Sequence, residues 1–91
     1  MKPLNNTEAL TVLTESITQI VPDADFAQVG PDDRIRDVLE LDSLDFLSLV
    51  ESLSARTGVR IDEEDYPELT TLSDATRFLV ARSKDSRSPA Q

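Results

Sequence analysis

The stretch DSLDFLSLVESLSART, residues 42–57, carries the clearest helix pattern in the chain. Asp42 is a favourable N-cap because its carboxylate can accept hydrogen bonds from the free N–H groups of a first turn, and Gly58 is typical of the position after a last turn. At helical spacing, one arc of about 100° holds the residues expected to face the core: Phe46, Leu49, Val50, Leu53 and Thr57. The opposite side holds Leu44, Ser48, Glu51 and Ala55. The segment is therefore predicted to be an amphipathic helix whose Leu44 points away from the core.

Two further helix patterns flank this segment. Residues 7–21 are predicted to form a helix with Thr7 as a possible N-cap and Pro22 as the breaker. The apolar side chains that recur at helical spacing are Leu10, Leu13, Ile17, Ile20 and Val21. Thr71 can cap a final helix whose apolar stripe runs to about Arg82. These patterns predict a first and a last main helix around the central one.

The connecting segments are less regular. Residues 22–41 show no sustained period and predict a long loop, in which residues 34–40 can form a turn of helix. Its apolar residues are expected to pin it to the core: Phe26, Val29, Ile35, Val38, Leu39 and Leu41. Residues 62–66 predict a short helical segment that Pro67 truncates. Since no segment alternates with period two, we predict an all-α fold: a small bundle of three main helices plus one short helix, with a long loop between the first and second helices.

Composition excludes several classes of function. The 91 residues contain no cysteine and no histidine, which removes thiol nucleophiles, imidazole bases and the usual zinc ligands. Two glycines cannot form a phosphate-binding loop, and the acidic runs lack the spacing of a calcium loop, so no metal site is expected. The net charge of −9 repels nucleic acids and anionic membranes, and favours partners with basic patches. Fourteen of the 18 acids lie between residues 23 and 68, against four arginines there.

Ser43 opens the central helix directly after the longest loop. A phosphate esterified to it would lie at the positive end of the helix, where backbone N–H groups can stabilise it. Without histidine the chain cannot activate this serine by itself, so any chemistry on Ser43 needs a base from another protein. The plain alternative for Asp42-Ser43 is an ordinary helix cap.

The sequence Leu41-Asp42-Ser43-Leu44-Asp45-Phe46-Leu47 resembles the Asp-Ser-Leu phosphopantetheine attachment motif of acyl carrier proteins. The order and spacing of the predicted elements over about residues 7–82 also resemble that family. The resemblance implies that Ser43 accepts 4′-phosphopantetheine from coenzyme A through a phosphopantetheinyl transferase. The thiol of this arm would then carry acyl groups as thioesters between partner enzymes, so the protein is expected to be a carrier and not an enzyme.

The same resemblance implies which residues meet the partners. Asp42 would be read by the transferase, and the partner-facing side of the helix would include Leu44, Asp45, Ser48 and Glu51. Typical fatty-acid carriers have a glutamate and an apolar residue such as methionine where this chain has Ser48 and Glu51. We therefore favour a specialised free-standing carrier in lipid modification or secondary metabolism over the general fatty-acid carrier. Phe46, near Ser43 on the core face, is expected to narrow the mouth of the acyl cavity.

Residues 1–82 are expected to form the carrier domain and residues 83–91 a flexible polar tail. The chain is expected to be a cytoplasmic monomer. Three alternatives remain open. An aminoacyl or peptidyl carrier would use the same serine, although the glycine-rich motif of such domains is absent from Glu40-Leu41-Asp42. An unmodified acidic helical adaptor would keep the bundle alone, and a domain excised from a larger synthase would share every feature named above.

Overall fold

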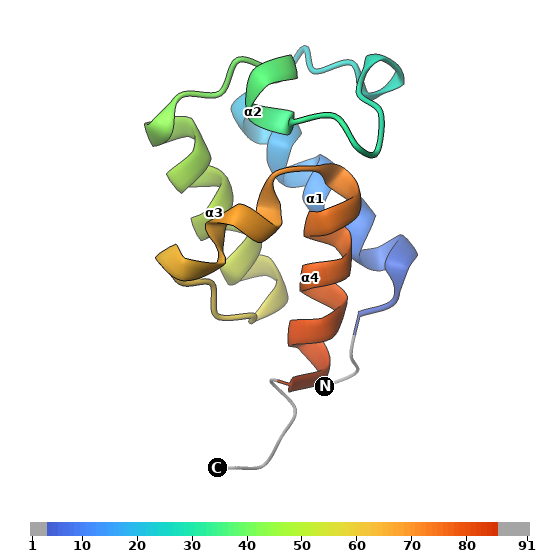
Figure 1. Cartoon of the computed structure of the whole chain (residues 1–91), viewed down its shortest axis with the longest axis vertical. Helices are drawn as coiled ribbons and strands as arrows, with labels where there is room; N and C mark the ends of the chain where they lie inside the picture. The colour runs from blue at the N-terminus through green and yellow to red at the C-terminus, as the bar shows by residue number, and fades with distance from the viewer. Residues whose placement is uncertain (1–3, 86–91) are drawn as a thin grey trace.

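The computed structural model describes residues 4–85 of the 91-residue chain. Within them, four α-helices and two 3-10 helices follow one another (Figure 1): α1 (Asn6–Ile20), η1 (Phe26–Gln28), α2 (Ile35–Val38), α3 (Ser43–Thr57), η2 (Glu63–Leu69) and α4 (Leu72–Asp85). This described part has no strand, only one isolated antiparallel bridge between Arg34 and Thr71. The predicted all-α class is confirmed, with α1, α3 and α4 as the main helices. None of the helices in residues 4–85 combines the length and apolar composition needed to cross a bilayer.

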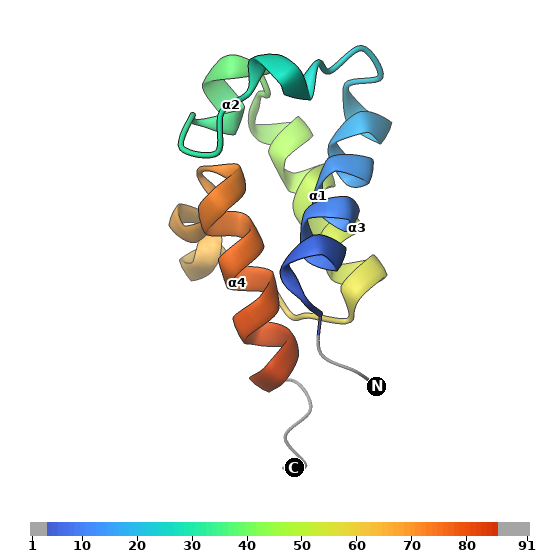
Figure 2. The ribbon, with the colours of Figure 1, turned by 90° about the vertical axis from the view of Figure 1, so that its right-hand side faces the viewer.

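The three main helices share one core. α1 packs against both α3 and α4, and Figures 1 and 2 show α2 and the segment before it lying across one end of the bundle. Each main helix contributes large side chains that are fully buried: Leu13, Ile17, Leu49, Leu53 and Leu79. Burial of each such side chain is worth about 1.5–3 kcal/mol, so this cluster is the main source of the fold's stability.

α1 begins one residue earlier than expected, and its N-cap is Asn5 and not Thr7. The Asn5 side chain accepts a hydrogen bond from the N–H of Glu8 at 2.7 Å, and the Glu8 carboxylate accepts one from the N–H of Asn5 at 3.2 Å. This reciprocal capping box satisfies two donors, whereas Thr7 already lies inside the helix. Leu10, expected on the apolar face, is 43% exposed, while Ser16 is buried. The buried face of α1 is thus rotated from the predicted one toward Ser16.

α3 agrees closely with its prediction. It starts at Ser43 directly after the N-cap Asp42 and ends before Gly58. The residues predicted to face the core are the buried ones: Phe46, Leu49, Val50, Leu53 and Thr57. Gly58 has a φ of 74°, a left-handed conformation in which a glycine has no Cβ to clash. Local signals alone define both ends of this helix.

The long segment 22–41 is tied to the start of α4 by backbone hydrogen bonds. The N–H of Ile35 donates to the carbonyl of Thr70 at 2.9 Å, and the N–H of Ser73 donates to the carbonyl of Pro31 at 3.0 Å. Three of the apolar side chains expected to pin the segment are buried: Val29, Ile35 and Leu41.

α2 occupies the predicted turn of helix, but Val38 does not help to pin it. The side chain of Val38 is 41% exposed. A helix of four residues has only one turn, and here that turn buries Ile35 alone. Val38 therefore remains at the surface.

The structure corrects the prediction at Pro67. η2 continues through Pro67 to Leu69 instead of ending at Tyr66. In an α-helix, a proline ring clashes with the carbonyl four residues earlier. A 3-10 helix instead uses hydrogen bonds between residues three apart, so η2 can continue through Pro67. The Pro67 carbonyl accepts a hydrogen bond from the hydroxyl of Thr70 at 2.7 Å, which closes the segment onto the next helix.

α4 begins as predicted and ends later. The hydroxyl of Thr71 accepts a hydrogen bond from the N–H of Asp74 at 3.0 Å, so Thr71 caps this helix. The helix passes Arg82 and includes residues 83–85 of the expected polar tail. The rest of that tail, residues 86–91, lies outside the described residues.

Candidate functional site

Ser43 is the first residue of α3, and its side chain is exposed. The adjacent Asp42 holds this end of the helix, since its Oδ1 accepts a hydrogen bond from the N–H of Asp45 at 2.8 Å. The carbonyl of Asp42 accepts the first helical bond, from the N–H of Phe46 at 2.9 Å. Within residues 4–85 no protein group forms a hydrogen bond with the Ser43 hydroxyl. That oxygen is therefore open to a reagent approaching from solvent.

The backbone before Ser43 makes a sharp and defined turn. Glu40 has a φ of 55°, and the N–H of Leu41 donates to the carbonyl of Arg36 at 2.9 Å. This is the pattern of a Schellman motif, in which a left-handed residue ends one helix. The Leu41 side chain is buried, so the chain enters α3 from a fixed point. Sequence reasoning missed this turn because glutamate is not a residue that favours the left-handed region.

The electrostatics around Ser43 combine opposing effects. The first N–H groups of a helix lack acceptors in the helix and carry partial positive charge. An anion bound to Ser43 would be stabilised by these groups. The carboxylates of Asp42 and Asp45 lie on either side of it in the sequence and oppose the same anion. A phosphate at Ser43 would therefore be attracted by the N–H groups of the first turn and repelled by the two carboxylates.

Beyond Ser43, α3 presents an exposed surface that we call the α3 outer face: Leu44, Leu47, Ser48 and Glu51. Leu44 is 74% exposed, as the helical wheel predicts, and Leu47 is 42% exposed. Sequence reasoning overlooked Leu47, although its position one turn after Ser43 could have indicated it. Asp45, predicted with this group, is half-buried and lies at the edge of the face.

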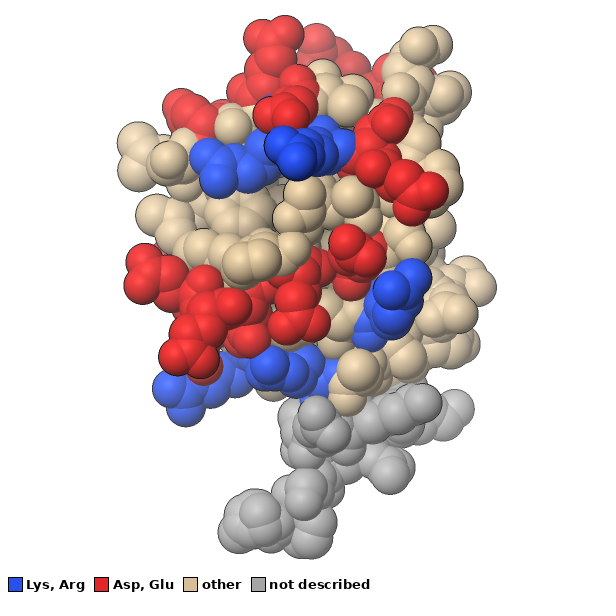
Figure 3. Space-filling model, viewed as in Figure 1, with Lys and Arg blue, Asp and Glu red and all other residues tan. Residues whose placement is uncertain are grey.

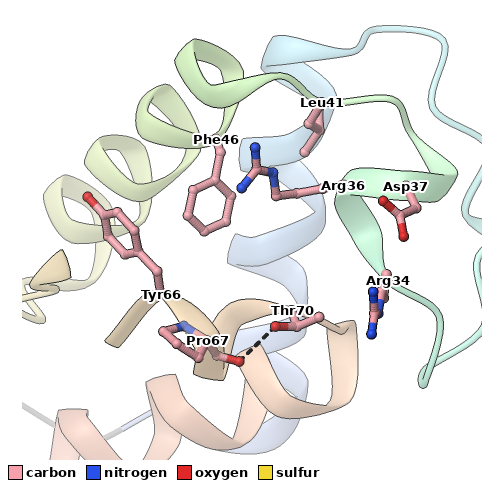
Figure 4. A pocket seen from close by; sticks show the side chains of 8 residues that line it. All are labelled: Arg34, Arg36, Asp37, Leu41, Phe46, Tyr66, Pro67 and Thr70. Atoms are coloured by element: carbon pink, nitrogen blue, oxygen red, sulfur yellow. Dashed lines mark hydrogen bonds between the residues drawn. The ribbon is translucent and has the colours of Figure 1, made fainter. Parts of the chain in front are cut away.

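A cavity of about 530 Å³ lies between α2, the first turn of α3 and η2 (Figure 4). The rings of Phe46 and Tyr66 meet edge to face there, with centroids 5.1 Å apart and an interplanar angle of 83°. The guanidinium carbon of Arg36 lies 5.0 Å from the centroid of the Phe46 ring. Phe46 thus lines the cavity near Ser43, and its effect on acyl chains stays a prediction. Neither Arg36 nor Tyr66 was identified from the sequence, because they lie on separate elements, α2 and η2, that meet Phe46 only in the tertiary structure.

Acidic side chains surround this region. On η2 and its cap the exposed acids are Asp62, Glu63, Glu64 and Glu68. Figure 3 shows acidic side chains above and below an uncharged hollow, with a basic band along the upper edge of that hollow. In the described part of the chain no group of three or more acids is placed to hold a metal ion. The charge pattern is that of a surface for basic partners.

The comparisons with known proteins point to one family. Residues 8–79 match the family model for the phosphopantetheine attachment site. The acyl carrier protein of Solidesulfovibrio magneticus is 33% identical over 70 residues, which are 74% of this chain and 90% of that protein. The acyl carrier protein of Acidothermus cellulolyticus is 32% identical over 79 residues, which are 85% of this chain and 90% of that protein.

A comparison with solved structures leads to the same family. The solution structure of a protein from Anaplasma phagocytophilum, named as a candidate acyl carrier protein, superposes on this chain with a TM-score of 0.78. It is 26% identical, and the match covers 91% of this chain and 97% of that one.

Proposed function

The chain belongs to the acyl carrier protein family, and on that premise we propose that Ser43 is the residue to which its 4′-phosphopantetheine arm is attached. The protein is a carrier and not an enzyme, and phosphopantetheine is its cofactor. The observation that carries the assignment to Ser43 is its exposed hydroxyl at the start of α3, behind the Asp42 cap. It lies inside the segment that matches the attachment-site model.

The attachment reaction needs little from this chain. The Ser43 oxygen would form a bond to the phosphorus that bears pantetheine in coenzyme A, and adenosine 3′,5′-bisphosphate would leave. The serine proton would pass to a base of the transferase, because this chain has no histidine to receive it. This chain supplies the position of the nucleophile: a hydroxyl at a capped helix end that forms no hydrogen bond with residues 4–85.

The transferase and the acyl-transferring enzymes are proposed to dock on the α3 outer face. Leu44 and Leu47 offer apolar contact area, and Glu51 with the exposed Asp42 offers charge for a basic patch. Electrostatic attraction between these acidic residues and a basic patch speeds the encounter of the carrier with its partner enzyme, while a small contact area keeps each complex short-lived. A carrier that visits several enzymes needs both properties.

The residues of the α3 outer face also support a proposal for the pathway that this carrier serves. Ser48 and Glu51 give α3 a pattern unlike that of typical fatty-acid carriers, which supports a specialised carrier in lipid modification or secondary metabolism. Use of coenzyme A as the donor supports loading in the cytoplasm. The aminoacyl or peptidyl carrier and the unmodified adaptor are not favoured, since the named relatives are acyl carrier proteins.

The assignment is tested by intact mass after incubation with coenzyme A, magnesium and a broad-specificity phosphopantetheinyl transferase. We expect one phosphopantetheine on the wild type, none on Ser43→Ala, and one on Ser54→Ala. Ser54 is the matched control because it is a partly exposed serine of the same helix that lies outside the α3 outer face. Modification of Ser43→Ala, or its absence from a folded wild type tried with several transferases, would contradict the assignment.

A further inference from the structure

Arg34 and Arg36 differ from the other arginines of the described region. Four arginines there have a carboxylate within 4 Å: Arg56, Arg60, Arg77 and Arg82. Neither Arg34 nor Arg36 forms an ion pair with any described residue, although the chain has a net charge of −9. Both side chains are exposed, so in this acidic protein their guanidinium groups remain available to an anionic ligand.

Both arginines line the same cavity, the one between α2, α3 and η2. Figure 4 shows the Arg36 side chain reaching toward Phe46, and Arg34 on the adjacent turn of backbone near Thr70. Asp37 also lines the cavity, but lies on the opposite side of Arg36 from Phe46 (Figure 4). The cavity thus combines aromatic walls with two cationic groups on its α2 side.

The position of Arg36 is defined by packing. Its guanidinium carbon is 5.0 Å from the Phe46 ring centroid, and Phe46 is itself held edge to face by Tyr66. A cation–π contact uses the charge of the guanidinium and needs no oxygen acceptor, so N–H donors remain for an anion. Because the planar N–H fork matches the geometry of carboxylates and phosphates, a carboxylate that enters the cavity can be bound through two parallel hydrogen bonds.

The cavity is within reach of an arm on Ser43. Two of its lining residues bracket that serine in sequence: Leu41 precedes it by two residues and Phe46 follows it by three. A flexible arm attached there can fold back so that its acyl end enters beside the first turn of α3. Tethering raises the effective concentration of that acyl end, so a modest attraction suffices to hold it.

We propose that the cavity receives acyl groups that end in a carboxylate, with Arg36 and Arg34 binding that carboxylate and the aromatic walls enclosing the carbon chain. The cargo class is the half-thioester of a dicarboxylic acid. An uncharged acyl chain would offer the two guanidinium groups no hydrogen-bond acceptor in place of the water that it displaces from the cavity. The inference rests on the proposed attachment at Ser43.

The test loads one matched pair of cargoes on the full chain. A broad-specificity transferase attaches the arm from glutaryl coenzyme A or from pentanoyl coenzyme A, and intact mass reports the loading. The two acyl groups have the same number of carbons and differ in the terminal carboxylate. The amide NMR signals of Arg36, Phe46 and Tyr66 then report entry into the cavity, and the rate of thioester cleavage by hydroxylamine reports protection.

On the wild-type protein, we expect the glutaryl cargo to shift these amide signals more than the pentanoyl cargo does. We also expect hydroxylamine to cleave the glutaryl thioester about threefold to tenfold more slowly on the wild type than on the Arg34→Gln/Arg36→Gln variant. The single variant Arg34→Gln leaves the contact of Arg36 with Phe46 intact and should show a partial loss. Arg60→Gln is the matched control, because it removes the same charge from a side chain that is 86% exposed and does not line the cavity. Arg60→Gln should keep the wild-type difference between the two cargoes, both in the amide shifts and in the rate of thioester cleavage.

Each contrary outcome has a separate meaning. Equal shifts for both cargoes, lost in the double variant, would assign the arginines to the phosphate of the arm and overturn the carboxylate proposal. A glutaryl effect that persists in the folded double variant would overturn it too. Absence of any mass gain on wild-type protein would overturn the attachment at Ser43 and this inference together, whereas loading without a cargo-dependent difference would overturn this inference alone.

Discussion

The carboxylate of Asp65 lies 2.8 Å from the guanidinium of Arg82 and joins η2 to α4. The second oxygen of Asp65 accepts a hydrogen bond from the N–H of Asp62 at 3.0 Å, so both oxygens are engaged. The Asp65 side chain is only 8% exposed, while that of Arg82 is 37% exposed and contacts the ring of Phe78. This ion pair fixes the short helix that forms one wall of the cavity.

Replacing Asp65 should therefore lower the stability of the whole domain. We expect Asp65→Ala to reduce the free energy of unfolding by about 2–3 kcal/mol, because it removes a buried charge-assisted hydrogen bond to Arg82 and the bond that Asp65 accepts from the backbone of the N-cap Asp62. Urea unfolding measures the loss. Glu64→Ala removes an exposed acid from the same helix and should change stability by no more than about 0.5 kcal/mol. Equal effects of the two variants would mean that the ion pair adds nothing.

Glu40 offers a prediction of the opposite sign. A residue with a side chain is strained at its φ of 55°, so Glu40→Gly should stabilise the protein by about 0.5–1 kcal/mol. Glu51→Gly, in the middle of α3, should instead destabilise by about 1 kcal/mol. The urea midpoints of the two variants should move in opposite directions, and a loss of stability in Glu40→Gly would show that its left-handed turn carries no strain.

Phe46 is expected to limit the space open to an acyl chain. Removal of its ring in Phe46→Ala should increase the sequestration of longer acyl chains, seen as larger acyl-dependent NMR shifts. The variant also loses the contacts with Tyr66 and Arg36 and should be destabilised by about 3 kcal/mol. Phe46→Leu keeps most of the side-chain volume and replaces Phe46→Ala in this experiment if the alanine variant does not fold. Acyl-dependent shifts that stay as in the wild type would count against a role of Phe46 at the mouth.

Leu44 is expected to matter for partners and not for folding. With 74% of its surface exposed, Leu44→Ala should leave the unfolding free energy within about 0.5 kcal/mol of wild type. The kcat/KM of the transferase should fall on the order of fivefold to tenfold, as for an apolar contact in an interface. Leu10→Ala, at an exposed leucine of α1, is the control and should stay within about twofold. Equal transferase kinetics for both variants would place the docking surface elsewhere.

Much of the fold could be predicted because its signals are local. The cap at Asp42, the glycine at position 58 and the apolar spacing between them define α3 and its buried face, and they also place Ser43 at a helix start. Prediction was wrong where two local signals compete. Asn5 and Thr7 are both capable caps, and the reciprocal bond with Glu8 decides between them. At Pro67 the outcome depends on whether the segment is an α-helix or a 3-10 helix, which a short acidic run does not reveal.

The sequence by itself determined the all-α class, the central helix, the acidic surface and the resemblance that singles out Ser43, because caps, breakers and helical spacing act over a few residues. Only the tertiary structure decided the cavity. Arg36, Phe46 and Tyr66 come from three separate elements, and they meet because Asp65 and Arg82 hold η2 to α4 while hydrogen bonds tie the segment 22–41 to the start of α4. Such contacts depend on how distant segments pack together, and no spacing within one segment encodes them.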